Sequence, residues 1–145
     1  MTRPLRVVIA DDHALFRTEV CHDLVDAGVD VCAEAEDGRA AVEAVLEYAP
    51  DAALLDVGMP GGGIEAAHEI GLRAPQTTVV MLSAAGDDET FTRALDAGVT
   101  GYLLKDFDGR RLADALTRAV AGERVGPPAF ARIAALHGDG SLRPR

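Results

Sequence analysis

The sequence has few of the features that mark secreted or membrane proteins. It has only two cysteines in 145 residues, Cys21 and Cys32, too few for a disulfide scaffold and too isolated for a zinc site. We expect two buried, inert thiols. No apolar run approaches the roughly 18 residues that span a bilayer, and the N-terminal segment has no small-residue cleavage site of a signal peptide. We therefore expect a cytoplasmic protein that makes no membrane contact.

Basic residues are also scarce. The chain has 14 Lys and Arg against 24 Asp and Glu, a net charge of −10, and 21 of the acidic residues lie before residue 109. Such a segment repels a phosphate backbone, so we expect no direct nucleic acid contact by this chain. The basic C-terminal part has no recognisable DNA-binding helix pair. Lys105 is the single lysine, the other 13 basic residues being arginine.

Short apolar runs alternate along the chain with longer segments of helical spacing. The runs are at 5–10, 29–35, 52–55, 78–82 and 102–104, and a segment with apolar residues three or four apart follows each one. Five β and five α segments in strict alternation predict an α/β fold, a doubly wound five-stranded parallel sheet of (βα)5 type with helices on both faces. The flavodoxin-like strand order 2-1-3-4-5 is the commonest at this size.

The character of the chain changes near residue 124. Gly126-Pro-Pro128 interrupts the pattern, and residues 129–136 predict a helical turn or two. With 48% hydrophobic residues and this length, we expect one domain at 1–124. Residues 125–145 are interpreted as a linker or C-terminal tail, with no DNA-binding domain in this chain.

Each polar group with chemistry stands at the carboxyl end of a predicted strand. Asp11 and Asp12 follow the first strand, Asp56 the third, Ser83 the fourth and Lys105 the fifth. In an open α/β sheet, ligands bind at this edge, near the switch point between the first and third strands. We therefore expect these side chains to converge on one crevice.

The physical chemistry of this cluster points to phosphoryl transfer. Three neighbouring carboxylates repel one another, and a hard divalent cation relieves that repulsion at neutral pH. Mg²⁺ suits a site with few carboxylates because it shares its shell with water and phosphate oxygens. An Asp carboxylate is a known phosphoryl nucleophile. Lys105 can neutralise the added charge, Ser83 can donate its hydroxyl, and Gly58 can lend a backbone carbonyl to the metal.

Four motifs in order carry a family resemblance: ADDHALFR at 10–17, LLDVGMPGG at 54–62, VVMLSA at 79–84 and GYLLKD at 101–106. Together they resemble the receiver domain of a two-component response regulator, over about residues 5–122. The residues of the first and last motifs resemble those of the subfamily whose members usually carry a C-terminal LuxR-type helix-turn-helix. No such segment follows in this chain, so the expected output domain is absent or separate.

The resemblance implies a role for each matching residue. Asp56 is the implied phosphoacceptor, and Asp11, Asp12, Asp56 and the Gly58 carbonyl are the implied Mg²⁺ ligands. Ser83 and Lys105 are the implied phosphoryl ligands, and Tyr102 is the aromatic switch partner of Ser83. The implied partner is a sensor histidine kinase, and the implied output is altered self-association, as a homodimer, that controls transcription. The signalling surface is then the face of the fourth helix, fifth strand and fifth helix.

Two other classes of function fit the sequence less well, and one alternative stays open. A phosphohydrolase or mutase with an Asp nucleophile generally needs an acid two residues later, where this chain has Gly58. A flavodoxin-like nucleotide carrier needs a glycine loop after the first strand, where this chain is anionic. A pseudo-receiver, acting as an interaction module without phosphorylation, is the alternative. Three consecutive glycines at 61–63 predict a loosely held entry to the third helix.

Overall fold

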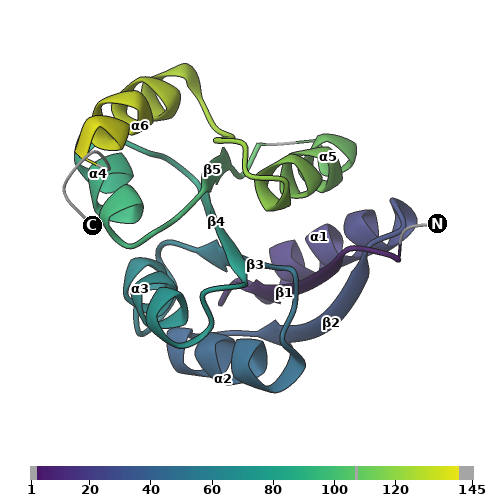
Figure 1. Cartoon of the computed structure of the whole chain (residues 1–145). Helices are drawn as coiled ribbons and strands as arrows, with labels where there is room; N and C mark the ends of the chain where they lie inside the picture. Colours follow the sequence, from purple (N-terminus) through teal and green to yellow (C-terminus); the bar gives the residue numbers. More distant parts are fainter. Residues whose placement is uncertain (1–2, 107, 141–145) are drawn as a thin grey trace.

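The computed structural model describes residues 3–106 and 108–140 and confirms the predicted α/β fold (Figure 1). The sheet has five parallel strands in the order β2-β1-β3-β4-β5. The strands are β1 (Arg6–Ala10), β2 (Asp30–Ala35), β3 (Ala52–Asp56), β4 (Thr78–Ser83) and β5 (Gly101–Leu104). A helix follows each of them: α1 (Ala14–Asp26), α2 (Gly38–Tyr48), α3 (Gly63–Arg73), α4 (Asp88–Asp96) and α5 (Gly109–Val120).

Local signals set the ends of these helices. The side chains of Asp37, Asp87 and Asp108 accept hydrogen bonds from the first-turn amides of α2, α4 and α5. Helices α1, α4 and α5 are followed by glycines with positive φ: Gly28, Gly98 and Gly122. This backbone conformation is readily adopted only by glycine, so these helices end where the sequence predicts.

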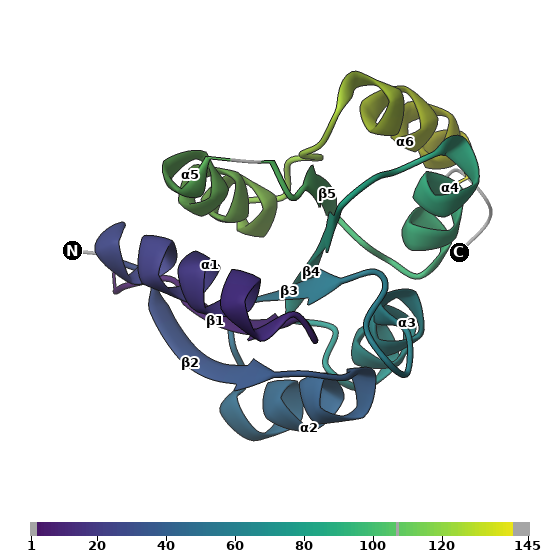
Figure 2. The same cartoon turned by 180° about the vertical axis from the view of Figure 1, so that it is seen from behind.

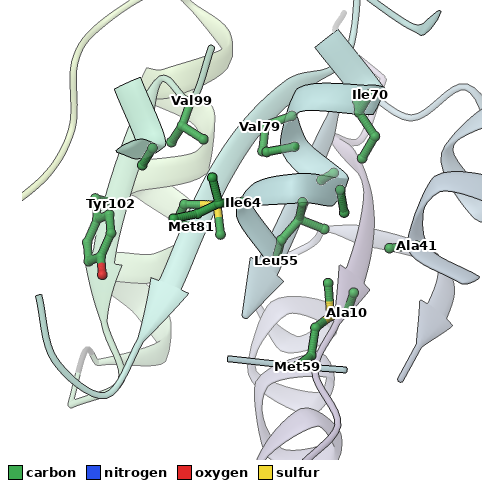
Figure 3. Close-up of a cluster of buried hydrophobic side chains, with 14 of the residues drawn as sticks. Ala10, Ala41, Leu55, Met59, Ile64, Ile70, Val79, Met81, Val99 and Tyr102 are labelled. Atoms are coloured by element: carbon green, nitrogen blue, oxygen red, sulfur yellow. The ribbon is translucent and has the colours of Figure 1, made fainter. Parts of the chain in front are cut away.

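Side chains alternate between two cores, one on each face of the sheet. One core, between the sheet and α2, α3 and α4, takes one set of strand residues: Val8, Ala10, Ala53, Leu55, Val79, Met81 and Tyr102 (Figure 3). The other core, between the sheet and α1 and α5, takes the intervening set: Val7, Ile9, Ala52, Leu54, Val80, Leu82 and Leu103. Figure 2 shows α1 and α5 together on their side of the sheet. The same alternation decides where the residues beyond the strand ends point.

A sixth helix, α6 (Pro128–Gly140), packs against α4 (Figures 1 and 2). It is longer than the predicted turn or two because Phe130 and Ala134 are buried on the core beside α4. Before it, Val125 forms a parallel bridge with Gly101 at the edge of β5. The boundary at residue 124 stays a prediction, and residues 141–145 of the expected tail lie outside the described residues.

The two cysteines are free thiols and are half-buried rather than buried. Burial, reinforced by Glu34, raises the pKa of Cys21 to about 12, and burial also raises the pKa of Cys32. Both are therefore poor nucleophiles at neutral pH. Within the described part of the chain, no helix combines the length and the apolar character needed to cross a bilayer.

Candidate functional site

The polar residues singled out in the sequence lie along the carboxyl edge of the sheet. Asp11 and Asp12 directly follow β1, Asp56 and Ser83 are the last residues of β3 and β4, and Lys105 directly follows β5. Because β1, β3, β4 and β5 are parallel neighbours, their carboxyl ends meet at one edge. The chain thus gathers residues that are far apart in sequence.

Three carboxylates form a tight cluster at this edge. Oxygens of Asp11, Asp12 and Asp56 lie within 4.8 Å of one another. Asp11 is fully buried and Asp56 is 6% exposed, whereas Asp12 faces solvent. Burial, with the charges of Asp11 and Asp12, raises the pKa of Asp56, although Lys105 opposes that rise. The cluster therefore has a surplus of negative charge that a cation would relieve.

Lys105 brings the positive charge into the cluster. Its Nζ lies 2.8 Å from Asp11 Oδ2 and 3.1 Å from Asp56 Oδ1. Burial opposes the charge on this ammonium, but its contacts with the two carboxylates outweigh burial and raise the pKa of Lys105. The ammonium also lies 4.7 Å from the ring centroid of Phe16, a favourable cation–π distance. Lys105 therefore places a protonated ammonium beside Asp56 at neutral pH.

The donor set fits a hard divalent cation. Asp11 Oδ1 accepts a hydrogen bond from the His13 amide at 2.9 Å. Asp11 Oδ2 is buried, and the Lys105 ammonium at 2.8 Å is the only donor that approaches it within the described residues. One ammonium does not balance three neighbouring carboxylates, and a cation held by Asp11, Asp12 and Asp56 would offset the remaining negative charge. Carboxylate oxygens with open positions for water are what Mg²⁺ prefers.

Two residues of α1 support this cluster and were not singled out from the sequence. The Arg17 guanidinium donates to the backbone carbonyl of Asp11 and, at 3.0 Å, to Glu34 Oε1 of β2. It therefore fixes the turn that carries the acidic pair. Phe16 contributes the ring beside Lys105. Both lie in the ADDHALFR motif one turn after Asp12, and that spacing was the available signal.

Ser83 and Tyr102 meet at a single acceptor, the carbonyl oxygen of Ala85. The Ser83 hydroxyl donates to this oxygen, and the Tyr102 hydroxyl donates to it at 3.0 Å. Burial raises the pKa of Tyr102, so the phenol stays a neutral donor at physiological pH. Asp56 pairs with Leu82 in the β3–β4 register, so Ser83 lies next to the acidic cluster along the sheet edge. The role of the Ala85 carbonyl could not be read from the sequence.

The loop after Asp56 leaves one side of its carboxylate open. A side chain at Gly58 would meet only Asp56 Oδ2, at 3.9 Å. At Gly63, in contrast, a side chain would collide with the Asp56 carbonyl. The glycine run is held by backbone hydrogen bonds rather than left loose: Gly62 to Met59, Gly63 to Val57 and Gly38 to Pro60. Gly61 and Gly62 have φ near +80° in this turn, a conformation that favours glycine.

The fold and the site together define an α/β domain with an acidic pocket and a lysine at the carboxyl edge of a five-stranded parallel sheet. Residues 7–117 match the response regulator receiver domain family. The chain belongs to this family, whose members are signalling phosphoacceptor domains rather than enzymes.

Named relatives are regulators of the NarL/LuxR type. The chain is 42% identical over 118 residues to the transcriptional regulatory protein DegU of Brevibacillus brevis, covering 80% of this chain and 48% of DegU. It is 38% identical over 128 residues to the probable transcriptional regulatory protein NarL of Mycobacterium tuberculosis, covering 87% and 59% of the two chains. The chain thus spans about half to three fifths of these relatives.

A solved structure agrees with this assignment. The signal receiver domain of the putative response regulator NarL from Mycobacterium tuberculosis is 36% identical, with a TM-score of 0.80. The match covers 84% of this chain and all of that receiver domain. Together with the family match, it confirms the resemblance that the four sequence motifs predict.

Proposed function

We propose that Asp56 accepts a phosphoryl group from a sensor histidine kinase and that this modification switches a signalling surface of the domain. The observation that carries the proposal is the position of Lys105, whose ammonium contacts both Asp11 and Asp56. A fixed cation beside a nearly buried carboxylate is suited to hold the charge of a phosphorylated aspartate.

The transfer is a single displacement at phosphorus. A carboxylate oxygen of Asp56 attacks the phosphorus, and an O–P bond forms as the bond between phosphorus and the donor breaks. The electron pair of the broken bond leaves with the donor, as the imidazole of a phosphohistidine or as the acetate of acetyl phosphate. Lys105 and the Ser83 hydroxyl then bind oxygens of the new acyl phosphate.

The same proposal assigns a metal site. Asp11, Asp12, Asp56 and the Gly58 carbonyl would hold Mg²⁺, which when bound neutralises charge on the transferred phosphoryl group. Arg17 keeps the Asp11 turn in place for this task. The open space at Gly58 leaves one side of Asp56 without a neighbouring side chain, so a phosphodonor can approach from there.

Intact-mass spectrometry tests the proposal directly. The chain is incubated with Mg²⁺ and acetyl phosphate, alongside Asp56→Asn and the control Asp51→Asn, the same substitution just before the start of β3. We expect one phosphoryl adduct in the wild type and in Asp51→Asn, none in Asp56→Asn, and none when EDTA replaces Mg²⁺. An adduct that persists in Asp56→Asn would refute the assignment. No adduct in the wild type would favour a phosphorylation-independent pseudo-receiver module.

The output follows from the named relatives by analogy. DegU and NarL are described as transcriptional regulatory proteins, and this chain spans only part of their length. We propose that the phosphorylated domain acts in the cytoplasm and controls dimerisation and transcription through an output domain outside residues 1–145. Gel filtration of the phosphorylated and unmodified chain tests the first step, with a shift to twice the mass as the expected result.

A further inference from the structure

Three aromatic rings, from β5, α4 and α6, pack against one another near Ser83. Tyr102 of β5 lies edge-to-face with Phe91 of α4, with ring centroids 4.7 Å apart. Phe130 of α6 lies 5.6 Å from Phe91 and 5.8 Å from Tyr102. The rings of Phe130 and Tyr102 are fully buried. Figure 3 shows Tyr102 at one end of the core, with its hydroxyl at the tip of the buried ring.

Helix α6 thus covers part of the expected signalling surface, the face formed by α4, β5 and α5. It packs along α4 (Figure 2), and His137 Nε2 adds a polar contact to Asp96 Oδ1 at 2.8 Å. The Phe130 ring packs on the inward-pointing Tyr102 ring, so this contact is lost when Tyr102 turns outward. Docking of α6 and the inward position of Tyr102 therefore stabilise each other.

A hydrogen-bonded link joins this aromatic group to the phosphoacceptor site. The Ala85 carbonyl receives the hydroxyls of both Ser83 and Tyr102. Gly86, the next residue, lies so close to the Phe91 and Tyr102 rings that a side chain there would collide with both. A change at Ser83 can therefore alter the position of Tyr102 in two ways: through the shared Ala85 carbonyl oxygen, and through the close contact of Gly86 with the Tyr102 ring.

We propose that α6 is the element that reads the phosphorylation state, and that phosphorylation of Asp56 tightens its docking on α4 and β5. This inference rests on the proposed function. When the Ser83 hydroxyl turns to the phosphoryl group, the Ala85 carbonyl is left to Tyr102 alone. The phenol is then held more firmly inward, and the surface on which Phe130 packs is favoured. Because the coupling is thermodynamic, an undocked α6 weakens phosphoryl-group stabilisation by the same factor.

Hydrogen exchange of the α6 amides measures this coupling. The wild type is compared with and without Mg²⁺ and acetyl phosphate, and intact mass is recorded on the same samples. We expect exchange in residues 130–137 to slow by about fivefold or more in the phosphorylated chain. Absence of an adduct would count against the proposed function. An adduct with unchanged or faster α6 exchange would overturn this inference alone.

Two substitutions with matched controls separate coupling from simple packing. Tyr102→Phe keeps the ring but removes the donor to Ala85, so α6 should stay docked and lose its response to phosphorylation. Tyr48→Phe removes the chain's other phenol, on α2, and should leave the response intact. An unaltered response in Tyr102→Phe would overturn the link through Ala85.

The reciprocal experiment starts from α6. Phe130→Ala removes the fully buried ring, whereas Leu136→Ala removes a side chain of the same helix that is 67% exposed. At limiting acetyl phosphate, Phe130→Ala should lower the adduct fraction at steady state, and Leu136→Ala should match the wild type. Equal adduct fractions in both variants would show that α6 does not report on the site.

Discussion

Replacing Lys105 by methionine measures how far the acidic site depends on a single cation. The ammonium lies 2.8 Å and 3.1 Å from its two carboxylate partners, and the side chain is 21% exposed. At an effective dielectric constant near 20, each contact has roughly 5–6 kcal/mol of Coulomb energy, which desolvation largely offsets. Breaking a buried ion pair by removing one partner costs about 3–5 kcal/mol. Because the Lys105 side chain is partly exposed, we expect Lys105→Met to lower the unfolding free energy by about 3 kcal/mol, the lower end of this range.

Urea unfolding at pH 7 in EDTA is the assay, with Arg93→Met as the matched control. Arg93 pairs with Glu65 at 3.3 Å, but both side chains are more than half exposed, so its loss should cost at most about 1 kcal/mol. Mg²⁺ at about 100 times its Kd should raise the unfolding free energy of Lys105→Met by roughly 2.7 kcal/mol. Equal losses in the two variants would refute the argument, because Asp11 would then need no compensating charge.

Three further predictions concern stability and reactivity. The Arg3 guanidinium holds the pKa of the Asp51 carboxyl below its usual range, so this group stabilises the fold above pH ~4 and the effect is lost as pH falls through the lower, folded-state pKa. Asp51→Asn should therefore make the unfolding free energy depend less steeply on pH in the acid range. An unchanged slope would contradict this role of the Arg3–Asp51 pair. Ala49 has φ +46° at the end of α2, so Ala49→Gly should raise the unfolding free energy by ~0.5–1 kcal/mol, and a fall would contradict this. With a pKa of about 12, Cys21 should react with iodoacetamide at pH 8 roughly a thousandfold more slowly than a free thiol, a rate that mass spectrometry can follow.

The sheet and the position of the acidic residues could be predicted because they depend on local patterns. Each apolar run is bounded by a polar residue at one end and a glycine or proline signal after the next helix. Since parallel strands place their carboxyl ends together, Asp11, Asp56 and Lys105 had to converge once the order of elements was known. Neighbouring strands lie roughly 5 Å apart, but β3 and β4 lie between β1 and β5, so the 2.8 Å contact between Lys105 and Asp11 depends on the reach of the long lysine side chain.

The features that the sequence did not predict depend on tertiary contacts. Gly126-Pro-Pro128 was interpreted as a helix break followed by only a helical turn or two. Pro128 is instead the first residue of the 13-residue helix α6, where its missing N–H costs nothing. Phe130 gives α6 a reason to pack, and its partners Phe91 and Tyr102 come from elements 28 to 39 residues earlier. The link of Arg17 to the Asp11 carbonyl likewise involves a backbone atom that no sequence pattern reveals.

The alternation of side chains along the strands explains why the site has two differently connected halves. Continued past the strand ends, it directs Asp11, Asp56 and Lys105 toward α1 and α5, where Phe16 meets the lysine ammonium. It directs Ser83 the other way, toward Tyr102, α4 and α6. In the proposed switch, the charge around Asp56 is thus set from one face of the sheet, and phosphorylation of Asp56 is sensed on the other. Substitutions beside Phe16 should therefore alter how fast the adduct forms, whereas those beside Phe130 should alter how stable the adduct is and how α6 responds to it.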